Sequence, residues 1–149
     1  MMRKAVLLLA LLLGASVVQA QLPFLRKRDA QPQQPVLQGI DALRADFAAQ
    51  SGGTTVYFGG ESAILGAPAK AALGLEAAWL RRHPDVVVRI EGYGDSLDTR
   101  DHALAAGARR AEEVRSYLVL LRVPAAQLSA TSWGKERPGL GRAVTVLVR

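Results

Sequence analysis

The chain of 149 residues holds 19 lysines and arginines, 13 aspartates and glutamates, two histidines and no cysteine. This length suffices for one domain with a substantial hydrophobic core. Without cysteine, the chain has neither a disulfide framework nor a thiol that could accept a lipid. The basic surplus is modest and spread along the sequence, so it does not favour nucleic-acid binding over an ordinarily charged surface.

Residues 1–20 have the pattern of a secretory signal peptide, with a basic start, an apolar run from Ala5 to Val18 and small residues up to Ala20. The apolar run is shorter than the roughly 20 residues that a membrane-spanning helix needs. We therefore expect cleavage after Ala20, export to the periplasm, and no transmembrane segment in the mature chain. Any attachment to the envelope is then expected to be noncovalent.

Residues 21–35 contain three prolines and the basic patch Arg26-Lys27-Arg28, which predicts a flexible leader. Val36, Ile40, Leu43 and Phe47 then recur at helical spacing, so an amphipathic helix is predicted over about residues 36–50. Its apolar face has two alternative roles: to cover the domain, or to bind an envelope protein partner.

The following segment alternates between strand and helix patterns. Residues 54–58 are β-branched and aromatic and predict a strand. A helix is predicted over 67–82, with Pro68 in its first turn and Pro84 ending it. A second strand is predicted over 86–91, where Val86, Val88 and Ile90 share one face.

A long helix capped by Asp98 or Thr99 is predicted next, followed by strands over 128–133 and 142–149. Apolar residues at helical spacing predict its buried face: Leu104, Ala108, Ala111, Val114, Leu118 and Leu121. In the last strand Val144, Val146 and Val148 share a face. The order β-α-β-α-β-β predicts a two-layer α/β sandwich, with two helices on one face of a small mixed sheet.

A candidate binding site lies between the second strand and the long helix. Asp95 follows the strand end, where loops commonly carry binding groups, and Arg110 follows 15 residues later. A carboxylate can hold an ammonium group and a guanidinium can grip a carboxylate, so the pair suits a zwitterion. The helix N-terminus near Thr99 offers a second seat for a carboxylate. A structural salt bridge between Asp95 and Arg110, or positions on unrelated surfaces, are the alternatives.

Over about residues 54–149 the sequence resembles OmpA-like peptidoglycan-binding domains. The matching segments are Val56-Tyr57-Phe58, Gly92-Tyr93-Gly94-Asp95, Thr99-Arg100, Leu104-Ala105, Arg110, Ser132 to Pro138, and Arg142-Ala143-Val144. The resemblance implies noncovalent recognition of diaminopimelate in the peptidoglycan stem peptide, without catalysis and without a cofactor.

Carried over by position, the resemblance assigns roles to individual residues. Asp95 and Arg110 would hold the amino and carboxylate groups of diaminopimelate, and Glu61 would add a polar contact. The backbone N–H groups around Leu97, Asp98 and Thr99 would bind the remaining carboxylate. The expected location is the periplasm, reached through the predicted signal peptide, with association with the outer membrane.

Several positions depart from the family pattern. Ala103 stands where asparagine is usual, Asp98 where glycine is common, and Gly60 where an aromatic residue is frequent, while the loop at 138–142 is short. The alternative function is therefore a degenerate domain that serves as a protein-interaction or structural module of the envelope. An enzyme is not expected, because His83 and His102 have no cysteine or clustered partner in the sequence that would make a metal site or an acid–base pair.

Overall fold

The computed structural model describes residues 39–137 and 141–149. The predicted signal peptide (1–20), the predicted leader (21–35), the first residues of the helix expected from residue 36, and most of the short loop at 138–142 lie outside the described residues. None of the helices in the described part combines the length and hydrophobicity that crossing a bilayer requires.

The predicted order of strands and helices is confirmed, with a short 3-10 helix before the third strand. The elements are α1 (Ile40–Ser51), β1 (Thr55–Tyr57), α2 (Ala67–Arg82), β2 (Val88–Tyr93), α3 (Arg100–Leu120), η1 (Ala125–Gln127), β3 (Leu128–Gly134) and β4 (Arg142–Leu147).

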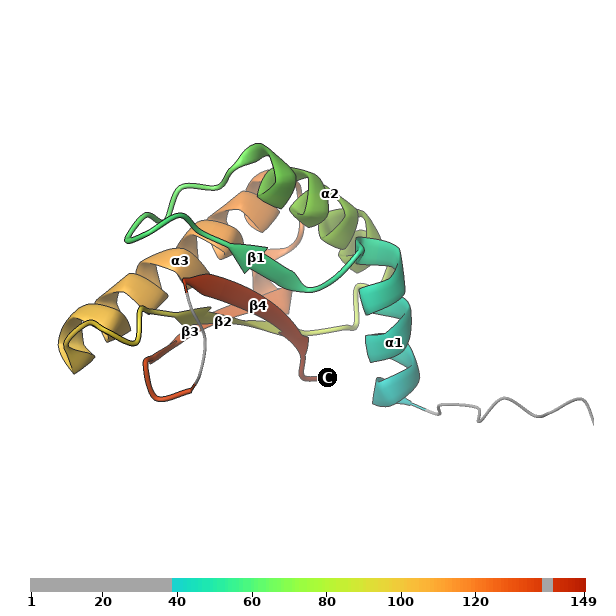
Figure 1. Cartoon of the computed structure of the whole chain (residues 1–149). Helices are drawn as coiled ribbons and strands as arrows, with labels where there is room; N and C mark the ends of the chain where they lie inside the picture. Colours follow the sequence, from blue (N-terminus) through green and yellow to red (C-terminus); the bar gives the residue numbers. More distant parts are fainter. Residues whose placement is uncertain (1–38, 138–140) are drawn as a thin grey trace, which may run out of the picture. The chain divides into compact units, whose positions relative to one another are not determined.

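The four strands form one mixed sheet in the order β1-β4-β2-β3. β2 runs parallel to β3, and β4 is antiparallel to both β1 and β2. Helices α2 and α3 cover the same face of this sheet, as Figure 1 shows. The predicted two-layer α/β sandwich is therefore the observed fold.

Helix α1 packs beside α2 and covers part of the hydrophobic core. Phe47 is buried, and its ring centroid lies 4.9 Å from that of Trp79 on α2. The Trp79 indole N–H donates to Asp46 Oδ2 at 2.7 Å. Of the two roles considered for this helix, the structure thus shows the covering one.

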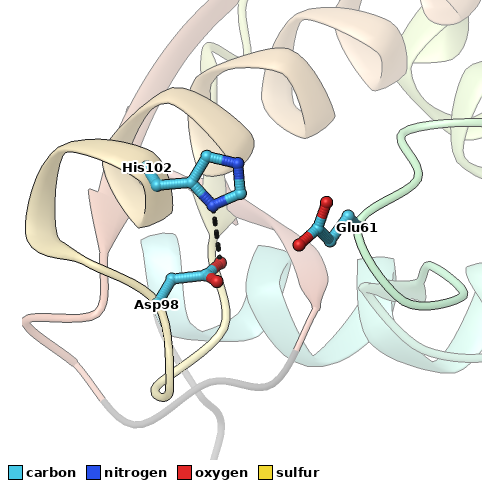
Figure 2. Close-up of side chains that lie close together, drawn as sticks. All are labelled: Glu61, Asp98 and His102. Atoms are coloured by element: carbon cyan, nitrogen blue, oxygen red, sulfur yellow. Dashed lines mark ion pairs between the residues drawn. The ribbon is translucent and has the colours of Figure 1, made fainter.

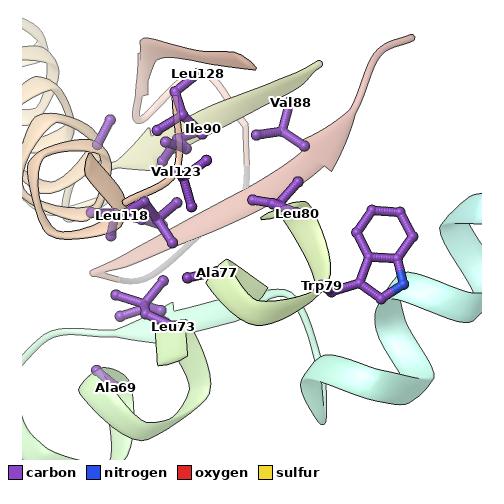
Figure 3. Packing of buried hydrophobic residues seen from close by; sticks show 14 of the residues in the cluster. Ala69, Leu73, Ala77, Trp79, Leu80, Val88, Ile90, Leu118, Val123 and Leu128 are labelled. Carbon is purple, nitrogen blue, oxygen red and sulfur yellow. The ribbon is translucent and has the colours of Figure 1, made fainter. Parts of the chain in front are cut away.

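The core lies between the helices and the sheet, and Figure 3 shows part of it. Leu73 and Leu80 of α2 and Val88 and Ile90 of β2 all belong to this core, and all four side chains are fully buried. The inward face predicted for β2 is thereby confirmed. Burying these side chains supplies the main stabilisation of the layer contact, at about 1.5–3 kcal/mol each.

The predicted buried face of α3 is wrong in its first half. Leu104 is 47% exposed and Ala108 is exposed, whereas Ala103, Ala106 and Gly107 are buried there. The cause is a very close approach of α3 to β2: a Cβ placed on Gly92 would lie only 1.9 Å from the carbonyl oxygen of Gly107. Only the smallest residues fit at such a contact, so the helix turns them, and not its leucine, toward the sheet. The second half follows the prediction, with Val114 and Leu118 buried.

Strand β4 alternates as predicted, but its core side is the one without the valines. Ala143, Thr145 and Leu147 are buried, while Val144 and Val146 are half-buried on the opposite face. No helix layer of the described residues covers that opposite face, and a sheet covered on one side alternates in this way.

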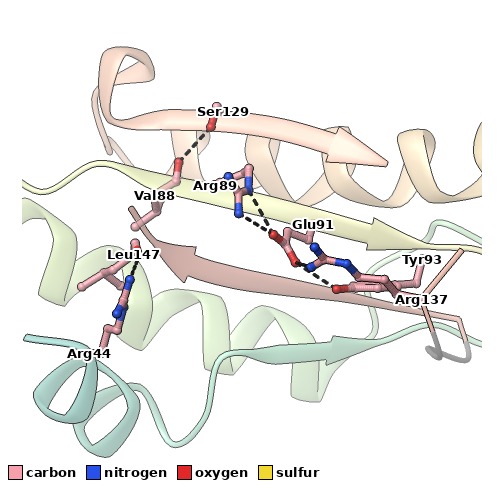
Figure 4. Close-up of polar contacts among 8 residues, drawn as sticks. All are labelled: Arg44, Val88, Arg89, Glu91, Tyr93, Ser129, Arg137 and Leu147. Carbon is pink, nitrogen blue, oxygen red and sulfur yellow. Dashed lines mark hydrogen bonds and ion pairs between the residues drawn. The ribbon is translucent and has the colours of Figure 1, made fainter. Parts of the chain in front are cut away.

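Figure 4 shows a polar network of β2 and of the segment that follows β3. Glu91 is buried and accepts hydrogen bonds from Arg89 Nη2 at 2.8 Å and from the Tyr93 hydroxyl at 2.9 Å. Arg137 Nη1 lies 3.7 Å from the same carboxylate, and its guanidinium stacks 3.6 Å from the Trp133 ring centroid. These contacts fasten the chain after β3 to the end of β2, next to the candidate site.

Candidate functional site

Arg110 forms the base of the candidate site. It lies in the middle of α3 and is 1% exposed. Its guanidinium donates from Nη1 to the Tyr93 carbonyl at 2.6 Å, from Nε to the Ser62 carbonyl at 3.2 Å, and from Nη2 to the Gly60 carbonyl. The side chain therefore ties α3 to the end of β2 and to the loop between β1 and α2. These bonds account for three of the five N–H donors of an arginine.

Three carboxylates act electrostatically on this buried cation. Burial, together with the charge of Arg109, lowers the pKa of the Arg110 guanidinium, whereas the charges of Asp95, Asp98 and Glu61 raise it. Since arginines stay protonated in a protein, the fixed positive charges of Arg110 and Arg109 meet the electrostatic influence of three acidic groups. The excess of negative charge favours a ligand that carries an ammonium group or another cation.

Asp95 lies in the loop between β2 and α3, and its side chain and its carbonyl group both accept hydrogen bonds within that loop. Its Oδ1 atom accepts a hydrogen bond from the Leu97 N–H at 3.1 Å, and its carbonyl accepts from the Asp98 N–H at 3.4 Å. The Leu97 side chain is 94% exposed. Two of the backbone N–H groups expected to meet a ligand are thus engaged inside the loop in this structure.

Thr99 begins α3 as its N-cap. Its hydroxyl oxygen accepts from the His102 N–H at 3.3 Å, so of the two cap candidates the structure shows Thr99. Lys135, just after β3, donates from Nζ to the Asp98 carbonyl at 2.5 Å. Arg100 pairs with Glu136 through Nε at 2.9 Å. The residues that follow β3 therefore stabilise both this loop and the start of α3.

Gly94 permits the loop to pass directly over α3. A Cβ on Gly94 would lie 2.4 Å from the Ala103 carbonyl oxygen, so no larger residue fits without a backbone shift. Ala103, one of the departures noted in the sequence, is fully buried beneath this contact. Ala103 thus serves packing in this chain. The two glycines of Gly92-Tyr93-Gly94-Asp95 are explained by the close approach of their backbone to that of α3.

A model of the family described as "OmpA family" matches residues 57–144, which include every candidate site residue. The chain belongs to the OmpA family.

Curated relatives agree with this membership. The peptidoglycan-associated lipoprotein of Rhizobium meliloti is 41% identical over 86 residues, which cover 58% of this chain and 49% of that protein. The protein of the same name from Pseudomonas aeruginosa is 42% identical over 99 residues, which cover 66% of this chain and 58% of the relative. The chain matches about half the length of these curated relatives.

Solved structures share the fold. The peptidoglycan-associated lipoprotein from Burkholderia pseudomallei superimposes with a TM-score of 0.63 at 34% identity, over 65% of this chain and 92% of that one. The C-terminal domain of Helicobacter pylori MotB gives a TM-score of 0.58 at 18% identity, over 63% of this chain and 82% of that one. The second likeness is one of fold alone.

The structure brings four of the six predicted side chains together. Glu61, Asp95 and Asp98 act electrostatically on Arg110, whereas Leu97 is exposed to solvent and Thr99 caps the helix. Asp95 and Arg110 form no ion pair with each other in the described part of the chain, yet they share one electrostatic environment. Neither alternative considered from the sequence, a salt bridge or unrelated surfaces, describes them.

Sequence reasoning missed two features of the site. The carbonyl groups of Gly60, Ser62 and Tyr93 that hold Arg110 are backbone atoms, and no side-chain pattern announces them. The sequence suggests no clustered partner for His102, but its Nδ1 lies 3.1 Å from Asp98 Oδ2. The four-residue spacing at the start of a helix was a signal for this pair.

Proposed function

We propose that this chain binds peptidoglycan noncovalently in the cell envelope, by recognising the diaminopimelate residue of the stem peptide. The observation that carries the proposal is a buried guanidinium under the electrostatic influence of carboxylates from two different loops, at the position where the family motif lies. No bond is made or broken in this scheme, so the protein acts by binding alone and uses no cofactor.

The side-chain end of diaminopimelate is a zwitterion, and the two charges of the site suit its two halves. The Asp95 carboxylate uses Oδ1 within its own loop, which leaves Oδ2 to accept from an ammonium group. Within the described residues, the three carbonyls account for three donors of Arg110, and its other two N–H groups suit a carboxylate. The start of α3 adds a positive dipole end beside them.

The relatives support the proposal through their names. Those from Rhizobium meliloti and Pseudomonas aeruginosa are called peptidoglycan-associated lipoproteins. A periplasmic location, reached through the expected signal peptide, and association with the outer membrane through an envelope protein partner belong to the same proposal.

A second candidate is a module that keeps the fold and binds a protein instead of peptidoglycan. Asp98 favours it, because this extra carboxylate adds negative charge beside Asp95. The engagement of the Leu97 and Asp98 N–H groups within the loop favours it as well, since those donors are occupied.

Co-sedimentation with purified sacculi distinguishes the two candidates. We expect Asp95→Asn and Arg110→Lys to weaken binding by about tenfold or more, because each loses a charge-assisted hydrogen bond to the ligand. Asp101→Asn and Arg109→Lys are matched controls, since both residues are exposed neighbours of the same helix. Thermal unfolding of each variant separates loss of binding from loss of fold. Undiminished binding by both Asp95→Asn and Arg110→Lys would refute the proposed site.

A further inference from the structure

Glu61, Asp98 and His102 converge beside the candidate site, as Figure 2 shows. Glu61 comes from the loop between β1 and α2, Asp98 from the loop before α3, and His102 from the first turn of α3. One potential ligand atom of each residue lies within 4.8 Å of those of the other two. Segments separated by about 40 residues of chain are thus brought to one point.

The geometry of two of these groups is already close to that of metal ligands. Asp98 Oδ2 and His102 Nδ1 are 3.1 Å apart. Two ligand atoms of a tetrahedral zinc ion, each bound at about 2.0–2.2 Å, are separated by about 3.3–3.5 Å. Glu61 is exposed, so a change of side-chain rotamer can bring its carboxylate across the remaining distance.

The charges in the cluster also favour a cation. Glu61 makes no hydrogen bond or ion pair with any residue in the part of the chain that the structure describes, and its carboxylate faces that of Asp98. The positive charge of Arg110 opposes a cation, but three of its N–H groups are engaged by the carbonyls of Gly60, Ser62 and Tyr93. A divalent ion would neutralise the two carboxylates and replace the single contact between Asp98 and His102.

We propose that Glu61, Asp98 and His102 form a site for one divalent transition-metal ion with the ligand preference of Zn²⁺. Imidazole nitrogen and carboxylate oxygen are ligands that Zn²⁺ accepts at these distances. Three protein ligands leave a coordination position for water or for an anionic group of another molecule. The metal site shares Glu61 and Asp98 with the proposed peptidoglycan site, but His102 belongs to the metal site alone.

Calorimetric titration of the untagged, chelator-treated chain with Zn²⁺ tests the proposal directly. The expected result is saturable binding of one ion per chain. His102→Ala and Glu61→Gln should each weaken it by at least about tenfold, since even the loss of a partner behind a ligand costs that much. The controls His83→Gln and Asp101→Asn alter the second histidine and a neighbouring carboxylate, and should bind Zn²⁺ as the wild type does.

Nuclear magnetic resonance of the two histidine side chains provides an independent readout. Zn²⁺ should shift the imidazole signals of His102 and leave those of His83 in place, and this comparison does not depend on a variant that folds. Absence of saturable binding, or binding unaffected by His102→Ala, would overturn the proposal. The measurement uses no peptidoglycan, so it stands apart from the proposed function. His102→Ala should still sediment with sacculi in the presence of a chelator.

Discussion

Replacing Glu76 by glutamine is expected to stabilise the protein at neutral and alkaline pH. Glu76 lies on α2 inside the core and is fully buried. In the described structure neither of its carboxylate oxygens has a well-formed hydrogen bond. Burial raises its pKa from the ordinary 4.5 to about 7, and the nearby Thr145 hydroxyl offsets only part of this effect.

The direction of the pH dependence follows from the two pKa values. Between pH 4.5 and about 7 the folded protein retains a proton on Glu76 that the unfolded chain has released, so stability falls as the pH rises through this range. At about 1.4 kcal/mol per pH unit, the full loss is roughly 3 kcal/mol. Above pH 7 to 8 the destabilisation by the ionised Glu76 is constant, and below pH 4.5 it is absent.

Urea unfolding followed by circular dichroism from pH 4 to pH 8.5 measures this effect. The Glu76→Gln variant should match the wild type near pH 4 and exceed it by up to roughly 3 kcal/mol at pH 8, because glutamine remains neutral. Glu113→Gln, an exposed position on α3, serves as the control and should follow the wild type throughout. The same pH dependence in the wild type and in Glu76→Gln would refute this explanation.

Two further predictions concern the packing of α3. Gly92→Ala should lower the free energy of unfolding by roughly 1–3 kcal/mol or more, because its Cβ would strike the Gly107 carbonyl. Gly74→Ala serves as the control: it has open space around it on α2, so it should raise the free energy of unfolding by roughly 0.5–1 kcal/mol. Equal effects of the two substitutions in urea titrations would contradict the close approach of α3 and β2. Leu118→Ala should lower the free energy of unfolding by about 2–5 kcal/mol and Leu104→Ala by less than about 0.5 kcal/mol, since of these two leucines only Leu118 is buried. A large decrease for Leu104→Ala in the same urea titrations would contradict the helix face that the structure shows.

Local patterns in the sequence predicted the elements well. The bounds predicted for α2 match the observed Ala67–Arg82, because a proline in the first turn and another after the end leave little freedom. The inward side of β2 follows directly from the alternation of Val88 and Ile90 with Arg89 and Glu91. The strand and helix order was then sufficient to predict the two-layer fold.

Features that depend on distant parts of the chain were not predicted. The face that α3 buries is decided by Gly92 and Gly107 meeting at the backbone, a contact that no helical periodicity contains. The base of the site depends on carbonyl groups at residues 60 and 62, which the fold alone carries to Arg110. The approach of Glu61 to Asp98 and His102 has the same origin.

Titration with a stem peptide tests the central proposal most directly. A peptide with diaminopimelate and its counterpart with lysine differ only in the side-chain carboxylate that we assign to Arg110 and the start of α3. The account predicts saturable binding of the diaminopimelate peptide, at least about tenfold weaker binding of the lysine peptide, and loss of this preference in Arg110→Lys. Equal affinity for the two peptides, or no binding of either by the folded protein, would contradict it.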